Sequence, residues 1–500
     1  MSAAAAAEAL ARALGRARYR VAAGLAGEEE TRAALAAHPE MFDRAAREAA
    51  HARRREPAGP DAGAGAADVA RARLALLWTL DLAVLDASLP LDAEARDREA
   101  GLRVPLADGT SLHTGEALHE VGRARDRDRR LAVADALFRV AGASIGPLRA
   151  ERLRREWELT ETLGLGDPAA ARARLLGGDA DVLRTIAERI LADTADIHDD
   201  AMGRLARRRL GLPVGRLARA DLGVLFDAPE LHVPSDGAAL SAMLRTQLAE
   251  GGLDADGGGR VRWDLEPRAG KRPRASCVAL AVPDEIALLV LPTGSIADCE
   301  ALWHEAGHAL HLASAPREAS FEERWLVDEA TAEGMAQLFG RIPAERAWLA
   351  RYLRLGRPEA EAAARGRATA ALFLVRRYAA RLLAELEGWA AADPELLRER
   401  WAERLSEATL VRYRPGEALL DVDAGLRSAA YVRGAVLAAG LGETMRERFD
   451  EDWFRNPSAG PALERLLAHD RAASPDEIAA AEGAAADAGA VRRDAERALG

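Results

Sequence analysis

The segment that most constrains the fold and function of this chain is Leu302–His311, with the sequence LWHEAGHALH. It places His304, Glu305 and His308 in the His-Glu-x-x-His pattern that is typical of zinc hydrolases. On an α-helix, His304 and His308 lie one turn apart and about 40° around the axis, so both imidazoles can reach one metal ion at roughly 2.0–2.1 Å. Glu305 lies beside them, where a carboxylate can take a proton from water. The segment therefore predicts a helix with two metal ligands and a general base.

The composition favours a mainly α-helical fold. The residues are 49% hydrophobic and 30% charged, but only 4% aromatic, and helix-forming Ala, Leu, Arg and Glu are abundant. A chain of 500 residues exceeds what one core needs. We predict an N-terminal helical region over residues 1–255, acting as a lobe or lid, and a catalytic region over residues 256–500. Residues 56–68 are rich in Pro, Gly and Ala, which predicts a mobile loop.

Charge and apolar patterning exclude several classes of partner. The net charge of −11 argues against nucleic acid, because phosphate binding needs a basic surface. Two cysteines are too few for a disulfide framework. Glu8, Arg12 and Arg16 interrupt any signal-peptide core near the start, and apolar runs such as Ile286–Leu291 are too short to span a bilayer. We expect a cytoplasmic protein that is a monomer or homodimer, with no membrane partner.

A short β-region precedes the metal motif. Extended segments are expected at 261–265, 275–280 and 285–291, and the last two flank the turn residues Val282-Pro283-Asp284. These two segments therefore predict a hairpin. Ser295, with Asp298 three residues later, resembles a capping box and places the start of the metal helix near Ile296.

The metal helix should end near Ala313, because Pro316 follows. A third ligand is expected from a Glu on the next helix. Glu329 lies 25 positions after His304 (329 − 304), which leaves room for a turn and an antiparallel return. Glu333, one turn later, can accept the free N–H of a ligating imidazole. We predict Glu329 as the ligand and Glu333 as its support; the reverse assignment, and two solvated glutamates, remain open.

His311 lies one turn after His308 on the same helix face. A fourth protein ligand would close the metal site to substrate. We therefore interpret His311 as a wall of the site or a residue behind the ligands, and an interior histidine with no role in the site is equally compatible with the pattern.

Several segments occur in the order found in a known family: 271–277 (KRPRASC), 285–291, His304–His311, Glu329, and 421–433. Together they resemble the thimet oligopeptidase and oligoendopeptidase F family of zinc metallopeptidases, as a divergent bacterial branch. The resemblance covers about residues 260–455, and its most specific piece is His-Glu-Ala-Gly-His-Ala-Leu-His. Gly307, inside that piece, lets a neighbouring helix or the substrate approach closely.

The resemblance implies a nearly all-α, two-lobed fold of the gluzincin type, with a small sheet beside the metal helix and a deep central channel. It implies hydrolysis of short peptides with one Zn²⁺ per chain on His304, His308 and Glu329, and with Glu305 as general base and then acid. It also implies an edge strand that pairs with the substrate backbone. The residues of that strand would be Ile286, Ala287, Leu288 and Leu289, although so apolar a run also fits a buried core strand.

The family uses a tyrosine from a C-terminal helix to stabilise the oxyanion, and Tyr431 matches it best, with Tyr413 as the alternative. Arg433 is a candidate for binding a peptide carboxylate, or else for a structural ion pair. The family's histidine ahead of the tyrosine has no counterpart, because no His occurs between Leu312 and Ala468. The region ahead of Tyr431 therefore departs from the family pattern. This departure affects the expected range of substrates and the expected rate of hydrolysis.

Three alternatives remain. If a cation such as Arg433 holds the C-terminal carboxylate, the protein is a dipeptidyl carboxypeptidase or metallocarboxypeptidase. A di-iron or di-manganese carboxylate protein would use Glu-x-x-His pairs. The chain offers three such pairs, Glu48/His51, Glu116/His119 and Glu305/His308. The third alternative is a non-catalytic helical scaffold that retained the motif.

Overall fold

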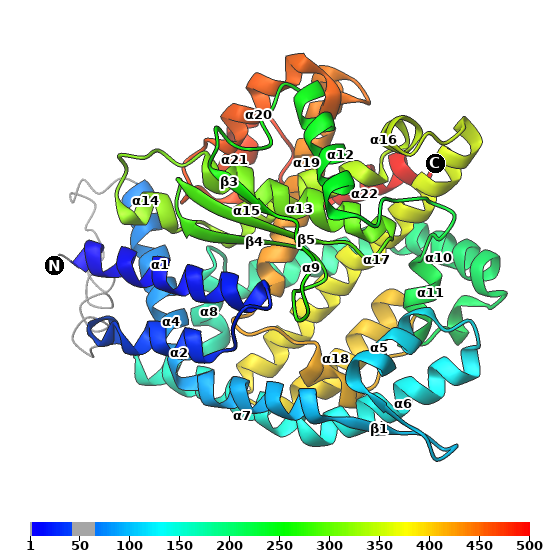
Figure 1. Cartoon of the computed structure of the whole chain (residues 1–500), viewed down its shortest axis with the longest axis horizontal. Coiled ribbons are helices and arrows are strands. Elements are labelled where there is room, and N and C mark those ends of the chain that lie inside the picture. Colours follow the sequence, from blue (N-terminus) through cyan, green and yellow to red (C-terminus); the bar gives the residue numbers. More distant parts are fainter. Residues whose placement is uncertain (1–2, 43–65) are drawn as a thin grey trace.

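The computed structural model describes residues 3–42 and 66–500, and it is mainly helical with two small sheets (Figure 1). The helices of the N-terminal half are α1 (Ala3–Ala22), α2 (Glu29–Ala36), α4 (Ala66–Gly101), α5 (Thr114–Arg123), α6 (Arg127–Ser144), α7 (Gly146–Thr162), α8 (Pro168–Leu175), α9 (Ala180–Asp193), α10 (Ala195–Leu210), α11 (Leu222–Phe226) and α12 (Gly237–Glu250). The predicted loop at 56–68 lies outside the described residues, except for the first residues of α4.

The C-terminal half continues the helical architecture. Its helices are α13 (Ile296–Ala313), α14 (Phe321–Trp325), α15 (Glu329–Gly340), α16 (Arg346–Tyr352), α17 (Arg357–Ala390), α18 (Pro394–Thr409), α19 (Ser428–Phe449), α20 (Gly460–Leu467), α21 (Pro475–Glu482) and α22 (Ala488–Leu499). The mainly α fold class is confirmed.

The three-stranded sheet has the order β3-β5-β4, formed by β3 (Val261–Asp264), β4 (Arg274–Ala281) and β5 (Glu285–Leu291). β4 and β5 form the predicted antiparallel hairpin, and β3 pairs with β5 in parallel. The prediction that β5 is an edge strand for substrate is wrong, because β5 is paired on both sides and Ile286, Ala287, Leu288 and Leu289 are at most 1% exposed. The free edge next to the metal helix belongs to β4.

A second hairpin, β1 (Arg103–Pro105) with β2 (Ser111–His113), was not expected from the sequence. Its strands have three residues each, too few to show alternation. It packs against α6 through a small cluster that contains Val104 and Val133. It therefore lies away from the metal motif.

The sheet lies between two layers of helices. Val278, Leu280, Ala287 and Leu289 face α1, whereas alternate residues of β4 and β5 face the core around α13. Figure 1 shows α1 (dark blue) below the green strands, with α13 and α15 on the other side. The sheet thereby packs directly against the helix that carries the metal motif.

One of the two large hydrophobic clusters joins the two halves of the chain. It contains Leu77 and Leu183 from before residue 255 together with Leu382 and Val432 from after it. The boundary at 255 remains a prediction about function, but the core is continuous across it.

One helix in the described ranges, α4, is long and apolar enough to cross a membrane by length and composition. The sequence argument from short apolar runs did not anticipate it. Half of its apolar window is buried within the fold, where α4 packs against α7.

Candidate metal centre

The metal helix α13 begins and ends where the sequence predicts, at Ile296 and Ala313. The Asp298 carboxylate accepts hydrogen bonds from the backbone N–H groups of Thr293 (2.8 Å), Gly294 (2.7 Å) and Ser295 (2.9 Å). Since these donors would otherwise lack partners, the capping carboxylate fixes the start of the helix and the rotation of its motif.

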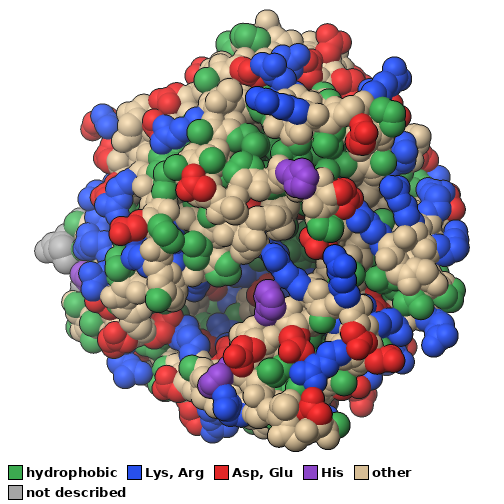
Figure 2. Space-filling model, turned by 45° about the vertical axis from the view of Figure 1, so that its right-hand side comes forward, with side chains coloured by type: hydrophobic (Ala, Val, Ile, Leu, Met, Phe, Trp, Pro, Cys, Tyr) green, Lys and Arg blue, Asp and Glu red, His purple; other side chains and the backbone are tan. Residues whose placement is uncertain are grey.

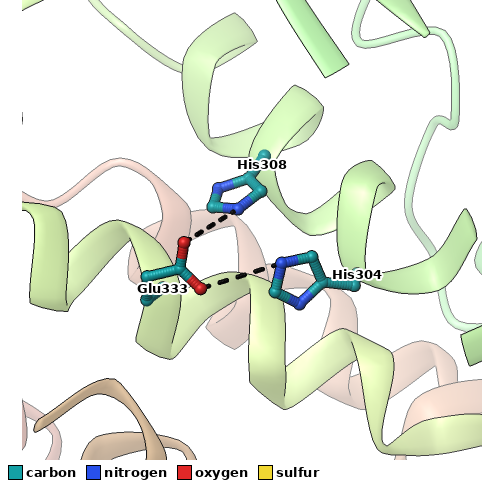
Figure 3. Close-up of side chains that lie close together, drawn as sticks. All are labelled: His304, His308 and Glu333. Carbon is teal, nitrogen blue, oxygen red and sulfur yellow. Dashed lines mark ion pairs between the residues drawn. The ribbon is translucent and has the colours of Figure 1, made fainter. Parts of the chain in front are cut away.

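Glu333 on α15 points its carboxylate at both histidines (Figure 3). Its two oxygens lie 3.8 Å from Nε2 of His304 and 3.7 Å from Nε2 of His308. One ligand atom from each of the three residues can be chosen so that all lie within 4.8 Å of one another. No other group of this kind, with three or more His, Cys, Asp or Glu side chains, occurs within residues 3–42 and 66–500.

This donor set fits a zinc ion. Two nitrogens and one carboxylate oxygen are the ligands of a catalytic zinc site, and metal–ligand distances of roughly 2.0–2.2 Å place tetrahedral ligands about 3.3–3.6 Å apart. The observed distances between the Glu333 oxygens and the two Nε2 atoms, 3.7 and 3.8 Å, are slightly longer than this range. Small rotations of the side chains would close the difference. All three side chains keep between 19% and 29% exposure, so substrate and water can reach them.

The structure brings Glu333 to the two histidines, where the sequence prediction had placed Glu329. The helices are antiparallel: Gly307 lies against Ala336, and Gly340 lies against His304. In this register Glu329 lies one turn, about 6 Å, further along α15. Its carboxylate instead lies 3.7 Å from Arg427. The sequence left this reverse assignment open, since the path of the connection between the helices was unknown.

Glycines make this register possible. A Cβ at Gly307 would lie 2.8 Å from Cα of Ala336, and one at Gly340 would lie 3.0 Å from Cβ of His304. The close approach predicted at Gly307 is therefore to a helix. On the other side of α15, a Cβ at Gly434 of α19 would lie 2.8 Å from Cβ of Glu333. Three helices thus meet at the ligands without room for a methyl group.

Glu305 lies between the metal ligands and the sheet. Its Oε2 accepts a hydrogen bond of 2.8 Å from the backbone N–H of Cys277 on β4. This N–H points away from β5, so it belongs to the outer edge of the strand. Glu305, the predicted general base, is therefore adjacent to the free edge of β4, whereas the sequence analysis had placed β5 beside it.

The electrostatics of the cluster suit a cation. Burial lowers the pKa of His304 to about 4 and that of His308 to about 3, so both imidazoles are neutral and can donate a lone pair. Burial raises the pKa of Glu305 to about 7, against the lowering effect of the Cys277 hydrogen bond. Burial, and then the charges of Glu305 and Glu329, raise the pKa of Glu333 to about 8. Crowded carboxylates beside neutral imidazoles favour a bound positive charge.

Tyr431 lies on the first turn of α19, and its ring stacks on Tyr378 of α17 at 4.6 Å between centroids. Burial raises the pKa of Tyr431, and the charges of Asp423 and Glu333 add to this. Burial raises the pKa of Tyr378; the charges of Arg381 and Arg377 lower it, and the charge of Glu333 adds to the rise. The charge of Glu333 thus acts on both phenols. Tyr378 was missed because it lies within a long helix with no motif around it.

Three predicted residues lie elsewhere. Arg433 is 7% exposed and donates a 2.8 Å hydrogen bond to the carbonyl of Leu176, which favours the structural alternative. Tyr413 is 5% exposed and packs on Trp401 in a separate hydrophobic cluster. His311 is 2% exposed, and burial holds its pKa well below the usual range, as expected for an interior histidine behind the site.

The alternative Glu-x-x-His pairs gain no support from the described residues. Glu48 and His51 lie outside the described residues. The carboxylate of Glu116 accepts the backbone N–H of His113 at 2.7 Å and so caps α5. Within the described ranges, this pair therefore joins no ligand group.

No family model matches the chain, and no curated protein matches it. Solved peptidase structures do match. PZ peptidase A with inhibitor 2 has a TM-score of 0.70 and 14% identity over 97% of this chain and 88% of that one. An M32 carboxypeptidase from Deinococcus radiodurans R1 has a TM-score of 0.61 and 16% identity over 98% and 95% of the two chains. A protein assigned as an oligoendopeptidase F from Bacillus anthracis str. Ames has 0.67 and 14% over 90% and 81%.

Identities this low establish the fold alone. The chain has the helical fold shared by oligoendopeptidase F-like and M32 peptidases, so the family resemblance is confirmed at the level of the fold.

Proposed function

We propose that the protein is a zinc-dependent peptidase that hydrolyses short peptides. The observation that carries this proposal is the position of Glu333 across from His304 and His308, with the carboxylate of Glu305 next to them on the same helix. Peptidases that share the fold support the reaction class.

His304, His308 and Glu333 would hold the metal. A zinc ion bound there would supply a Lewis acid that polarises the scissile carbonyl and lowers the pKa of a water molecule. Glu305 accepts the proton of the attacking water and later delivers it to the leaving amine. Its hydrogen bond from Cys277 keeps the carboxylate oriented between strand and helix.

The edge of β4 would align the substrate. Residues 275–277 present backbone groups on the side of the strand that faces away from β5, and an extended peptide can add to such an edge. Tyr431, with Tyr378 stacked on it, would donate its phenolic O–H to the developing oxyanion. Figure 2 shows a hollow below the centre of one face, with basic side chains visible inside it.

The decisive experiment combines metal analysis with a quenched fluorescent peptide library. Wild type should carry one zinc per chain and cleave short peptides. Glu305→Gln should keep its zinc and lose roughly 10²–10⁴-fold in rate. Glu318→Gln, an exposed glutamate after the same helix, is the matched control and should retain full activity. Zinc binding without cleavage of any peptide would overturn the proposal.

A further inference from the structure

Arg381 on α17 lies at the junction between that helix and the start of α19. It is 3% exposed. Its guanidinium donates hydrogen bonds to the hydroxyl of Ser428 (2.6 Å), the carbonyl of Asp421 (3.1 Å) and the carboxylate of Asp423 (2.8 Å). Ser428 is the first residue of α19, and the other two acceptors belong to the segment that leads into it. One buried side chain therefore joins α17 to the position where α19 begins.

The same guanidinium lies beside the two stacked phenols. Its central carbon is 5.4 Å from the ring centroid of Tyr378 and 5.7 Å from that of Tyr431. Tyr378 lies one turn before Arg381 on α17, and Tyr431 lies one turn after Ser428 on α19. A guanidinium at these distances from aromatic rings is attracted to them. The hydrogen bonds and the ring contacts of Arg381 therefore hold the same two helix turns together.

The backbone of Tyr431 is tied to the helix that carries the third candidate ligand. Its carbonyl accepts a hydrogen bond of 3.1 Å from the side chain of Gln337, which lies one turn after Glu333 on α15. A Cβ at Gly434, one turn after Tyr431, would lie 2.8 Å from Cβ of Glu333. Since the backbone is held next to the ligand helix, the direction of the phenol depends on its side-chain torsions and on the ring of Tyr378 stacked against it.

Arg381 also places a positive charge among carboxylates near the phenols. The carboxylate of Glu385, which is fully buried, lies 3.2 Å from Nε of Arg381. Burial, and then the charge of Asp423, raise the pKa of Tyr431. Burial also raises the pKa of Tyr378, and the charge of Arg381 opposes that rise. A phenol donates a hydrogen bond more strongly when a nearby cation stabilises the negative charge that its oxygen gains.

We propose that Arg381 is a positioning residue for the reaction: it holds the start of α19 against α17 and thereby keeps the hydroxyl of Tyr431 directed at the oxyanion. This inference rests on the proposed peptidase function, with Tyr431 as the oxyanion donor. Because Arg381 is buried, it acts through the phenol and not on the substrate. Its removal should lower kcat more than it raises KM, since the oxyanion forms only in the transition state.

The first test is a double-mutant cycle in steady-state kinetics. Arg381→Gln should lower kcat by about 10- to 100-fold, with KM changed by less than about threefold and zinc content unchanged. In Tyr431→Phe protein the same substitution should change kcat by less than about threefold, because the phenol through which it acts is gone. Arg381→Gln alone leaves the buried Glu385 without its cation. The variant that combines Arg381→Gln with Glu385→Gln removes both charges and is expected to show the same dependence on Tyr431.

Arg376→Gln is the matched control. Arg376 is on the same helix and is 4% exposed. It donates to the carbonyls of Ala408 and Leu191 and to the hydroxyl of Thr194. Its loss therefore removes a comparable set of buried hydrogen bonds, but it should leave kcat within about threefold of wild type.

Two kinetic results would overturn the positioning role. One is a loss of kcat in Arg376→Gln as large as that in Arg381→Gln. The other is an undiminished effect of Arg381→Gln in Tyr431→Phe protein. In either case the loss of activity would reflect damage to the fold and not the direction of the phenol.

The second test does not depend on turnover. The chain has five tyrosines, so protein labelled with fluorotyrosine should give five fluorine NMR resonances, which single Tyr→Phe variants assign. Arg381→Gln combined with Glu385→Gln should shift the resonances of Tyr378 and Tyr431, whereas Arg376→Gln should leave these two in place. Unshifted resonances in the combined variant would overturn the positioning role and leave the peptidase function intact. Shifted resonances in a protein that cleaves no peptide would overturn the peptidase function and leave the contact between Arg381 and the phenols.

Discussion

Helices α15 and α19 both contribute residues to the candidate site, but they do so in different ways. α15 presents Glu333 directly to the histidines of α13, and glycine contacts fix the register of the pair. α19 presents Tyr431 in its first turn and Arg427 just before its start, while Arg433 donates to the carbonyl of Leu176. The candidate metal ligands thus all come from one closely packed helix pair, α13 and α15. The opposite wall of the site, around Tyr431, is assembled from elements that are distant in the sequence.

Replacing the two glutamates of α15 with glutamine, one at a time, should give the largest effect, a change in zinc affinity. Glu333→Gln removes a ligand and should lower zinc affinity by more than about 100-fold, whereas Glu329→Gln, which loses only a neighbouring charge, should cost about tenfold or less. Competition with a chromogenic chelator measures both values. A greater loss for Glu329→Gln would restore the assignment made from the sequence and show that α15 shifts when metal binds.

The opposite wall is tested by its two stacked phenols. Tyr431→Phe should lower kcat by about 10²–10³-fold with unchanged zinc content, because it removes the donor to the oxyanion. Tyr378→Phe keeps the stacked ring and should cost less than about tenfold. Steady-state kinetics with one peptide decides between them. Equal effects would mean that the two hydroxyls act as a unit, and a larger effect of Tyr378→Phe would assign the donor to α17.

The packing that fixes the metal half can be tested in metal-free protein. Gly307→Ala should lower the free energy of unfolding by about 1–3 kcal/mol, because the added Cβ would lie 2.8 Å from Cα of Ala336. Gly366→Ala in α17 has no atom within 4 Å of the added Cβ and should raise the free energy of unfolding by about 0.5–1 kcal/mol. Urea titration followed by circular dichroism measures both. An unchanged stability of Gly307→Ala would show that the helix pair can separate without cost.

The difference between the α13–α15 pair and the opposite wall also explains which residues could be predicted from the sequence. His304, Glu305 and His308 follow from spacing on one helix, and the cap at Ser295 and Asp298 sets its start. The choice between Glu329 and Glu333 could not be made, because it depends on the register of two antiparallel helices across an irregular connection. β5 was chosen over β4 because its apolar run was the more prominent, although that property is typical of a central strand.

Residues contributed from distant segments left almost no local pattern. Tyr378 lies inside a helix of 34 residues without a motif. Arg433 was selected for its proximity to Tyr431 in sequence, but helical rotation takes its side chain to α8.

His198 lies away from the candidate site. It can therefore be used to separate the acid sensitivity of the fold from that of the site. His198 on α10 is fully buried, and burial, together with the charge of Arg376, lowers its pKa to about 3, although Asp199 lies 3.6 Å away. The unfolded chain binds this proton near pH 6.5 and the folded chain does not, so the stability is present above pH 6.5 and is lost as the pH falls toward 3.

The expected loss from this residue is about 1.4 kcal/mol between pH 7.5 and pH 5.5. His198→Leu should abolish that part of the pH dependence, as measured by urea unfolding of metal-free protein at the two pH values. Arg204→Gln, an exposed change on the same helix, serves as the control. If His198→Leu loses as much stability as wild type over this range, the acid sensitivity does not come from His198. It then arises at the buried histidines of α13, and the helix pair of α13 and α15 would be the part of the fold that acid unfolds first.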